Sequence, residues 1–60
     1  MSYTTKMKMA ELPEAVQAYA DAGFDPQAMR SLMDLLQEQT QFIQDRFWKM
    51  ADERQAQLAN

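Results

Sequence analysis

Hydrophobic positions in the second half of the chain recur at alternating intervals of four and three residues. The stripe consists of the apolar residues Met29, Met33, Leu36, Ile43, Phe47 and Met50 and of two polar residues, Thr40 and Arg54, which at such positions would fix the register of packed helices. Such spacing is typical of a helix with one apolar face, repeated every seven residues as in coiled coils. No Gly or Pro follows Pro26, and strong helix formers dominate the segment. The pattern therefore predicts one helix over residues 26–58, about 50 Å long.

A shorter amphipathic helix is predicted over residues 13–22. Pro13 suits the first helical position, where its missing N–H costs nothing. Gly23 can adopt the left-handed conformation that ends a helix, and Phe24 can then fold back over the last turn. Asp25-Pro26 would open the long helix, with Asp25 as the N-cap and the proline as the first helical residue.

The first nine residues alternate in character, with Tyr3, Thr5, Met7 and Met9 separated by Thr4, Lys6 and Lys8. A period of two indicates a short strand, whereas the terminal position favours a flexible tail, and both alternatives remain open. The predicted organisation is therefore a tail or strand over residues 1–9, followed by a helical hairpin over residues 10–60. The predicted fold class is all-α.

The two predicted helices differ too much in length to cover one another. A helix over residues 13–22 spans about 15 Å and, after a tight turn, reaches only residues up to about 38. Ile43, Phe47 and Met50 would then have no partner within the chain, although each would gain about 1.5–3 kcal/mol from burial. We therefore expect a second copy or a larger protein to cover them, giving a coiled-coil or four-helix-type bundle.

This mismatch predicts a non-enzymatic interaction module, such as a small accessory subunit or assembly adaptor. Trp48 is the expected anchor, because buried tryptophan dominates interface energetics. The full predicted interface consists of Met29, Met33, Leu36, Ile43, Phe47, Trp48 and Met50.

The composition lacks the residue types on which most metal sites and many catalytic sites depend. The chain has 60 residues, a net charge of −3, no Cys and no His. It therefore lacks the ligands of most zinc, haem and iron–sulfur sites, the usual general base and the strongest nucleophile. We expect no catalytic residues, cofactor, metal or small-molecule substrate. No apolar run approaches the ~20 residues of a membrane span, and the start lacks a secretory core, so a cytoplasmic location is expected.

One alternative rests on a family resemblance. A possible strand, Leu12-Pro13, a helix, Gly23 and a second helix follow in an order similar to that of ribbon–helix–helix repressors. The resemblance implies a dimeric DNA-binding regulator or antitoxin, with Thr4, Lys6 and Lys8 facing the major groove. Residues 10–60 carry four basic and nine acidic residues. This balance argues against duplex binding, which draws on phosphate neutralisation.

A second resemblance rests on composition and amphipathicity alone. An acidic amphipathic helix rich in Ala, Gln and Met looks like those of phasins, which coat storage-polymer granules. This resemblance implies a surface-coating protein as a further alternative.

Overall fold

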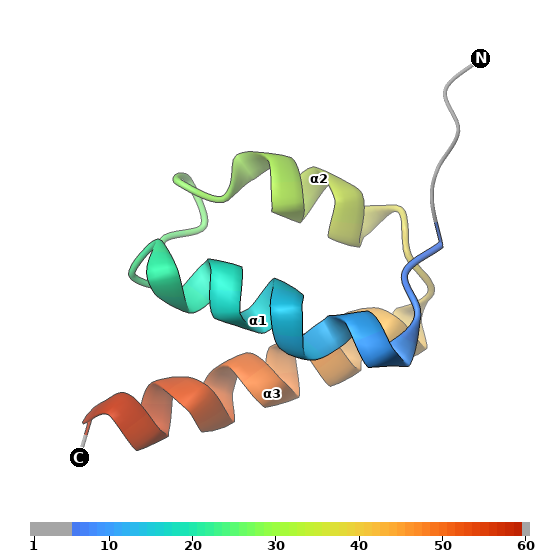
Figure 1. Cartoon of the computed structure of the whole chain (residues 1–60). Helices are drawn as coiled ribbons and strands as arrows, with labels where there is room; N and C mark the ends of the chain where they lie inside the picture. Colours follow the sequence, from blue (N-terminus) through green and yellow to red (C-terminus); the bar gives the residue numbers. More distant parts are fainter. Residues whose placement is uncertain (1–5, 60) are drawn as a thin grey trace.

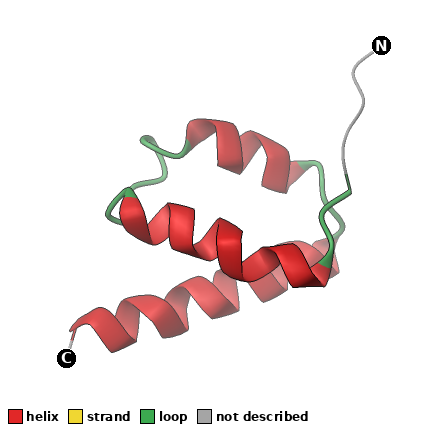
Figure 2. Cartoon of the chain, viewed as in Figure 1, coloured by secondary structure: helices red, strands yellow, loops and turns green. Residues whose placement is uncertain are grey.

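The computed structural model describes residues 6–59, and all regular structure in this range is helical (Figures 1 and 2). A 3-10 helix η1 (Met9–Glu11) leads into α1 (Leu12–Asp21), followed by α2 (Arg30–Gln37) and α3 (Gln41–Ala59). In Figure 1, α2 runs in the opposite direction to α1 and α3. The all-α prediction is therefore confirmed, but the described chain contains three α-helices rather than a hairpin of two.

Helix α1 ends as its sequence predicts. The N–H of Gly23 donates to the carbonyl of Ala20 at 2.9 Å, and the N–H of Phe24 donates to the carbonyl of Tyr19 at 2.9 Å. These two bonds form a Schellman motif, and the Phe24 ring packs on Tyr19 as that motif favours. The observed bounds, Leu12–Asp21, are one residue earlier at each end than the predicted 13–22.

The single helix predicted over residues 26–58 is wrong at its start. Asp25 accepts a hydrogen bond from the N–H of Gln27 at 3.0 Å, and its carbonyl accepts one from Met29 at 3.2 Å. Met29 has φ −107° and ψ 31°, outside the helical range, so the regular helix begins only at Arg30. Asp25 thus caps a turn that precedes α2 rather than the helix itself.

The same prediction is wrong at residues 38–40, where the chain leaves one helix and starts another. The last turn of α2 tightens, because the N–H groups of Glu38 and Gln39 donate to carbonyls three residues back. Thr40 then caps α3: its carbonyl accepts from the N–H of Gln44 at 3.0 Å, and its Oγ1 accepts from the N–H of Ile43 at 3.4 Å.

Gln39 stabilises this break from within. Its side chain is only 6% exposed; Oε1 accepts the N–H of Met7 at 2.6 Å, and Nε2 donates to the carbonyl of Leu35 at 3.2 Å. The Gln44 amide in turn donates to the Gln39 carbonyl at 2.9 Å. Side-chain amides therefore replace part of the backbone bonding that the interrupted helix gives up.

The core explains why the helix breaks. It is built from buried residues of all three helices: Leu12, Val16, Tyr19, Leu36, Ile43, Phe47 and Ala51. By reversing direction after α2, the chain brings the apolar face of α3 against α1 (Figure 1). Burying a large side chain such as Phe47 gains more free energy than local helix propensity loses at the bend.

The first nine residues are only partly described. Residues 1–5 lie outside the described residues, residues 6–8 have no regular structure, and Met9 begins η1. Met7 packs against the core, while Lys6 and Lys8 are exposed. The predicted strand is therefore absent from the described part of this segment.

Candidate interaction surface

The residues predicted to form an interface lie mostly inside the molecule. Leu36, Ile43 and Phe47 are buried, with 3%, 8% and 0% of their surface exposed. The half-buried methionines of the predicted set pack against the same core, and they are Met29, Met33 and Met50. The expectation that Ile43, Phe47 and Met50 lack a partner within the chain is therefore wrong, because they pack in one core with residues of α1. Of the predicted set, Trp48 alone remains exposed, at 37%.

Trp48 belongs to a group of four packed rings, which we call the aromatic cluster: Tyr19, Phe24, Phe47 and Trp48. The Tyr19 ring lies 5.4 Å from Phe24, 5.7 Å from Phe47 and 5.6 Å from Trp48, measured between centroids. Phe47 and Trp48 are 5.1 Å apart. Three of these four contacts are T-shaped, a geometry that aligns ring edges with ring faces and stabilises each pair by about 0.5–1.5 kcal/mol.

The turn after α1 places Phe24 in the aromatic cluster. Gly23 and Phe24 both have positive φ, at 73° and 58°. This conformation is ordinary for glycine but uncommon for a bulky residue. The edge-to-face contact with Tyr19 and the Schellman bonding hold Phe24 there in spite of its backbone strain.

The aromatic cluster is buried at Tyr19 and Phe47 and open to solvent at Trp48, while Phe24 is half-buried. The chain therefore presents two aromatic side chains, one from the α1–α2 turn and one from α3, each fixed by a buried ring beneath it. The predicted interface does not include Phe24, although its place five residues after Tyr19, at the end of a helix closed by Gly23, is the sequence signal for this contact.

Three other large apolar side chains of the described residues are exposed. Phe42 is 62% exposed near the start of α3, Leu58 is 60% exposed near its end, and Met9 of η1 is 44% exposed. Leu58 lies eleven residues after Phe47, about three helical turns further on nearly the same face of α3. It is exposed because the end of α3 diverges from α1 (Figure 1).

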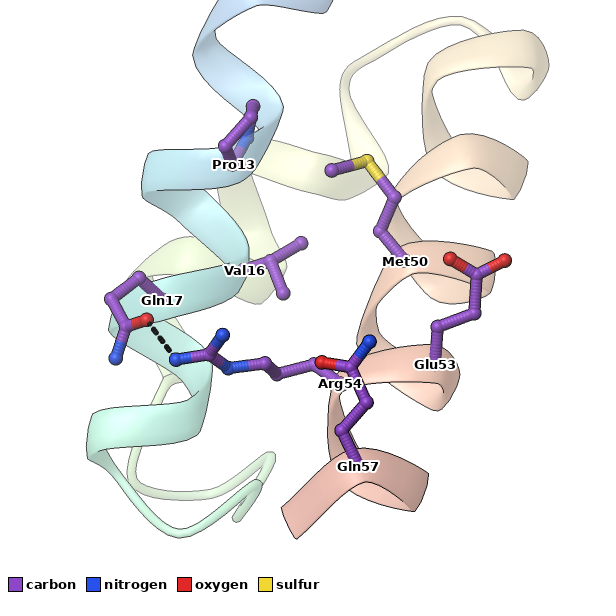
Figure 3. A pocket seen from close by; sticks show the side chains of 7 residues that line it. All are labelled: Pro13, Val16, Gln17, Met50, Glu53, Arg54 and Gln57. Atoms are coloured by element: carbon purple, nitrogen blue, oxygen red, sulfur yellow. Dashed lines mark hydrogen bonds between the residues drawn. The ribbon is translucent and has the colours of Figure 1, made fainter.

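A groove of about 190 Å³ separates the first part of α1 from the second part of α3 (Figure 3). Its walls are formed by Pro13, Val16, Gln17, Met50, Glu53, Arg54 and Gln57. Arg54 crosses the groove, where its Nη2 donates to Oε1 of Gln17 at 2.7 Å (Figure 3). Its Nε is buried without a hydrogen-bond partner. Arg54 thus ties α3 to α1, in the stripe position where the sequence placed a polar residue among apolar ones.

The structure describes only two of the three residues that the DNA-binding alternative places in the major groove. Thr4 lies outside the described residues, and Lys6 and Lys8 are exposed on either side of Met7. Lys8 is extended and is followed directly by η1, so no strand presents these side chains within the described range.

The described residues contain neither a candidate metal site nor a candidate membrane span. Among residues 6–59, no group of three acidic, His or Cys side chains is placed to hold a metal ion. Nor does any described helix combine the length and apolar character needed to cross a membrane. Comparison with protein-family models, curated proteins and solved structures gave no match.

Proposed function

We propose that the chain is a non-enzymatic protein–protein interaction module, a small accessory subunit or adaptor, that binds its partner through the open side of the aromatic cluster. The observation that carries this proposal is the 37% exposure of Trp48 on top of two buried rings. Phe24 adds a second aromatic surface from the neighbouring turn.

Ordered aromatic side chains are favourable anchors. Tryptophan and tyrosine are enriched among the few interface residues that carry most of the binding free energy. Immobilising a mobile side chain on binding costs about 0.5–1.5 kcal/mol of rotamer entropy. A side chain that is already held in place avoids most of this cost. Contacts with Tyr19 and Phe47 hold Trp48 in this way.

The mechanism differs from burial of the heptad stripe. Leu36, Ile43 and Phe47 already stabilise the folded chain, so a partner that needed them would have to unfold the core. The proposed contact uses only side chains that the fold leaves open, and the partner binds a folded chain.

Affinity capture with variants tests this function. Trp48→Ala should abolish capture of a partner that the wild-type chain retains. Lys49→Ala, an exposed neighbour on α3, should leave capture unchanged. A partner captured equally by the wild-type chain and the Trp48→Ala variant would refute the proposed contact.

Direct binding then gives a quantitative test. Trp48 is the sole tryptophan, so its fluorescence reports on this surface alone. Saturable binding of the captured partner should shift the emission to shorter wavelength as Trp48 loses contact with water. Because Trp48 also packs on Tyr19 and Phe47, circular dichroism must show that Trp48→Ala remains helical. If it unfolds, Trp48→Phe, which keeps an aromatic ring at this position, replaces it and should weaken binding by a smaller factor.

A further inference from the structure

We propose that two copies of this chain exchange α3, with residues 38–40 straightening so that α2 and α3 become one continuous helix in each copy. In the exchanged dimer, α3 of one copy packs on α1 and α2 of the other. The surface of α1 and α2 that binds α3 within one chain would bind α3 of the second copy, and the same contacts would re-form between two chains. This inference does not depend on the proposed partner contact at Trp48.

The sequence of the hinge, residues 38–40, is compatible with a continuous helix. Residues 38–40 are Glu38, Gln39 and Thr40, and neither Gly nor Pro occurs anywhere after Pro26. The alternating four-and-three spacing continues through the bend without a change of phase, from Leu36 to Thr40 to Ile43. A straight helix would therefore keep the apolar residues of α2 and α3 on one face.

The hydrogen bonds of the hinge can be replaced when it straightens. Two polar contacts stabilise the bend locally: Oγ1 of Thr40 accepts from the N–H of Ile43 at 3.4 Å, and Oε1 of Gln39 accepts from the N–H of Met7. The first of these is long for a hydrogen bond. Straightening exchanges such contacts for regular helical backbone bonds, while the apolar core is conserved between the two arrangements.

The directions of the helices determine how two exchanged copies would pack. Helix α2 runs opposite to α1 and α3 (Figure 1). When the bend opens, two continuous helices would therefore lie antiparallel, with each α3 segment alongside the α2 segment of the other copy. Each copy keeps its own α1 turn, which is fixed by the Schellman motif at Gly23.

Two substitutions in the hinge should move the equilibrium in opposite directions. Thr40→Ala removes the cap and raises helix propensity, which disfavours the bend by roughly fivefold. Because the dimer contains two straightened hinges, its association constant should rise by the square, roughly 25-fold. Thr40→Ser, which keeps the capping hydroxyl, is the matched control.

Gln41→Pro should have the opposite effect. Gln41 is the first residue of α3, a position where proline is tolerated, whereas proline inside a continuous helix is strongly disfavoured. This variant should keep the closed monomer and suppress the exchanged dimer by roughly 100-fold or more per hinge.

Sedimentation equilibrium from micromolar to millimolar concentration measures the outcome. We expect the wild-type chain to shift from 7.0 kDa towards twice that mass, the Thr40→Ala variant to do so at lower concentration, and Gln41→Pro to stay at 7.0 kDa. A wild-type chain and a Thr40→Ala variant that both remain monomeric throughout would overturn the proposal. A dimer that persists in Gln41→Pro would overturn it as well.

Isotope-filtered NMR on mixed labelled and unlabelled wild-type chains provides a test that needs no substitution. In an exchanged dimer, proximity signals between Tyr19 and Phe47, whose rings lie 5.7 Å apart, must arise between different chains. If the dimer shows these signals only within one chain, the two copies associate through another surface and the exchange is refuted.

Discussion

At the scale of single residues, burial separates two phenylalanines of α3, one inside the apolar stripe of the sequence and one outside it. Phe47 is fully buried beneath Tyr19 and Trp48, while Phe42, five residues earlier on the same helix, is 62% exposed. Their roles in stability should therefore differ sharply, although both are aromatic residues of α3.

Phe47→Ala should lower the free energy of unfolding by about 3–5 kcal/mol, because it removes a buried ring and leaves a cavity. Phe42→Ala, the matched control, should change it by no more than about 0.5 kcal/mol. Urea unfolding followed by circular dichroism measures both. Equal effects would contradict the observed core. Because Phe47→Ala weakens the fold itself, a loss of binding in this variant would not show that Phe47 contacts a partner.

Gly23 should be sensitive for a different reason. An added Cβ would meet nothing within 4 Å, so only the backbone conformation at φ 73° opposes a side chain. Gly23→Ala should therefore lower stability by about 1–2 kcal/mol, the cost of a left-handed conformation for an ordinary residue. Gly23→Asn should cost less, because Asn tolerates this conformation. The difference in thermal unfolding midpoint between the two variants checks the explanation, and a larger loss for Asn would argue against it.

At the scale of elements, what the sequence predicts depends on how local the signal is. The end of α1 is set by Gly23 and Phe24, whose conformational needs are visible in the sequence, and it was predicted within one residue. The break between α2 and α3 is stabilised by the core and by the N–H of Met7, which donates to the side chain of Gln39, 32 residues away in the chain. No local pattern indicates that bond.

Thr40 shows how a correct observation led to a wrong structure. Its polar side chain at a stripe position was a real anomaly, but a register-fixing residue in a long helix and an N-cap between two helices have the same sequence signature. The stripe itself was identified correctly, since Leu36, Ile43 and Phe47 do share one core. Of the candidate surface, the predicted interface contained Trp48 but not Phe24, although the turn that places Phe24 on Tyr19 was expected from the sequence.

The Gln39 bond predicts a stability effect at the α2–α3 connection. Gln39→Met keeps a side chain of similar length but leaves the N–H of Met7 without its acceptor, so unfolding should become easier by about 1–3 kcal/mol. Gln37→Met, at an exposed position on α2, should change stability by less than about 0.5 kcal/mol. Chemical denaturation compares the two. If Gln39→Met were neutral, the bond would not be what stabilises the bend.

At the scale of the whole molecule, a short chain closes its own core by reversing direction twice. The sequence contains ten Leu, Ile, Val and Phe residues, and six of the seven core positions are occupied by them or by Tyr19, with Ala51 as the seventh. Partly buried methionines fill the remaining space, a use that suits their flexible side chains. The described residues of one chain thus form a core of their own, and the same contacts would allow exchange between copies.

The central claim is that α2 and α3 are separate helices joined at Thr40, and the stability of Gln41→Pro tests it most directly. If α3 begins at Gln41, proline there should change the free energy of unfolding by no more than about 0.5 kcal/mol, because the first N–H groups of a helix have no partner within it. Lys49→Pro, in the middle of α3, should cost about 3 kcal/mol or more. A similar loss for Gln41→Pro would mean that one helix runs through residues 38–40 and would contradict the structure.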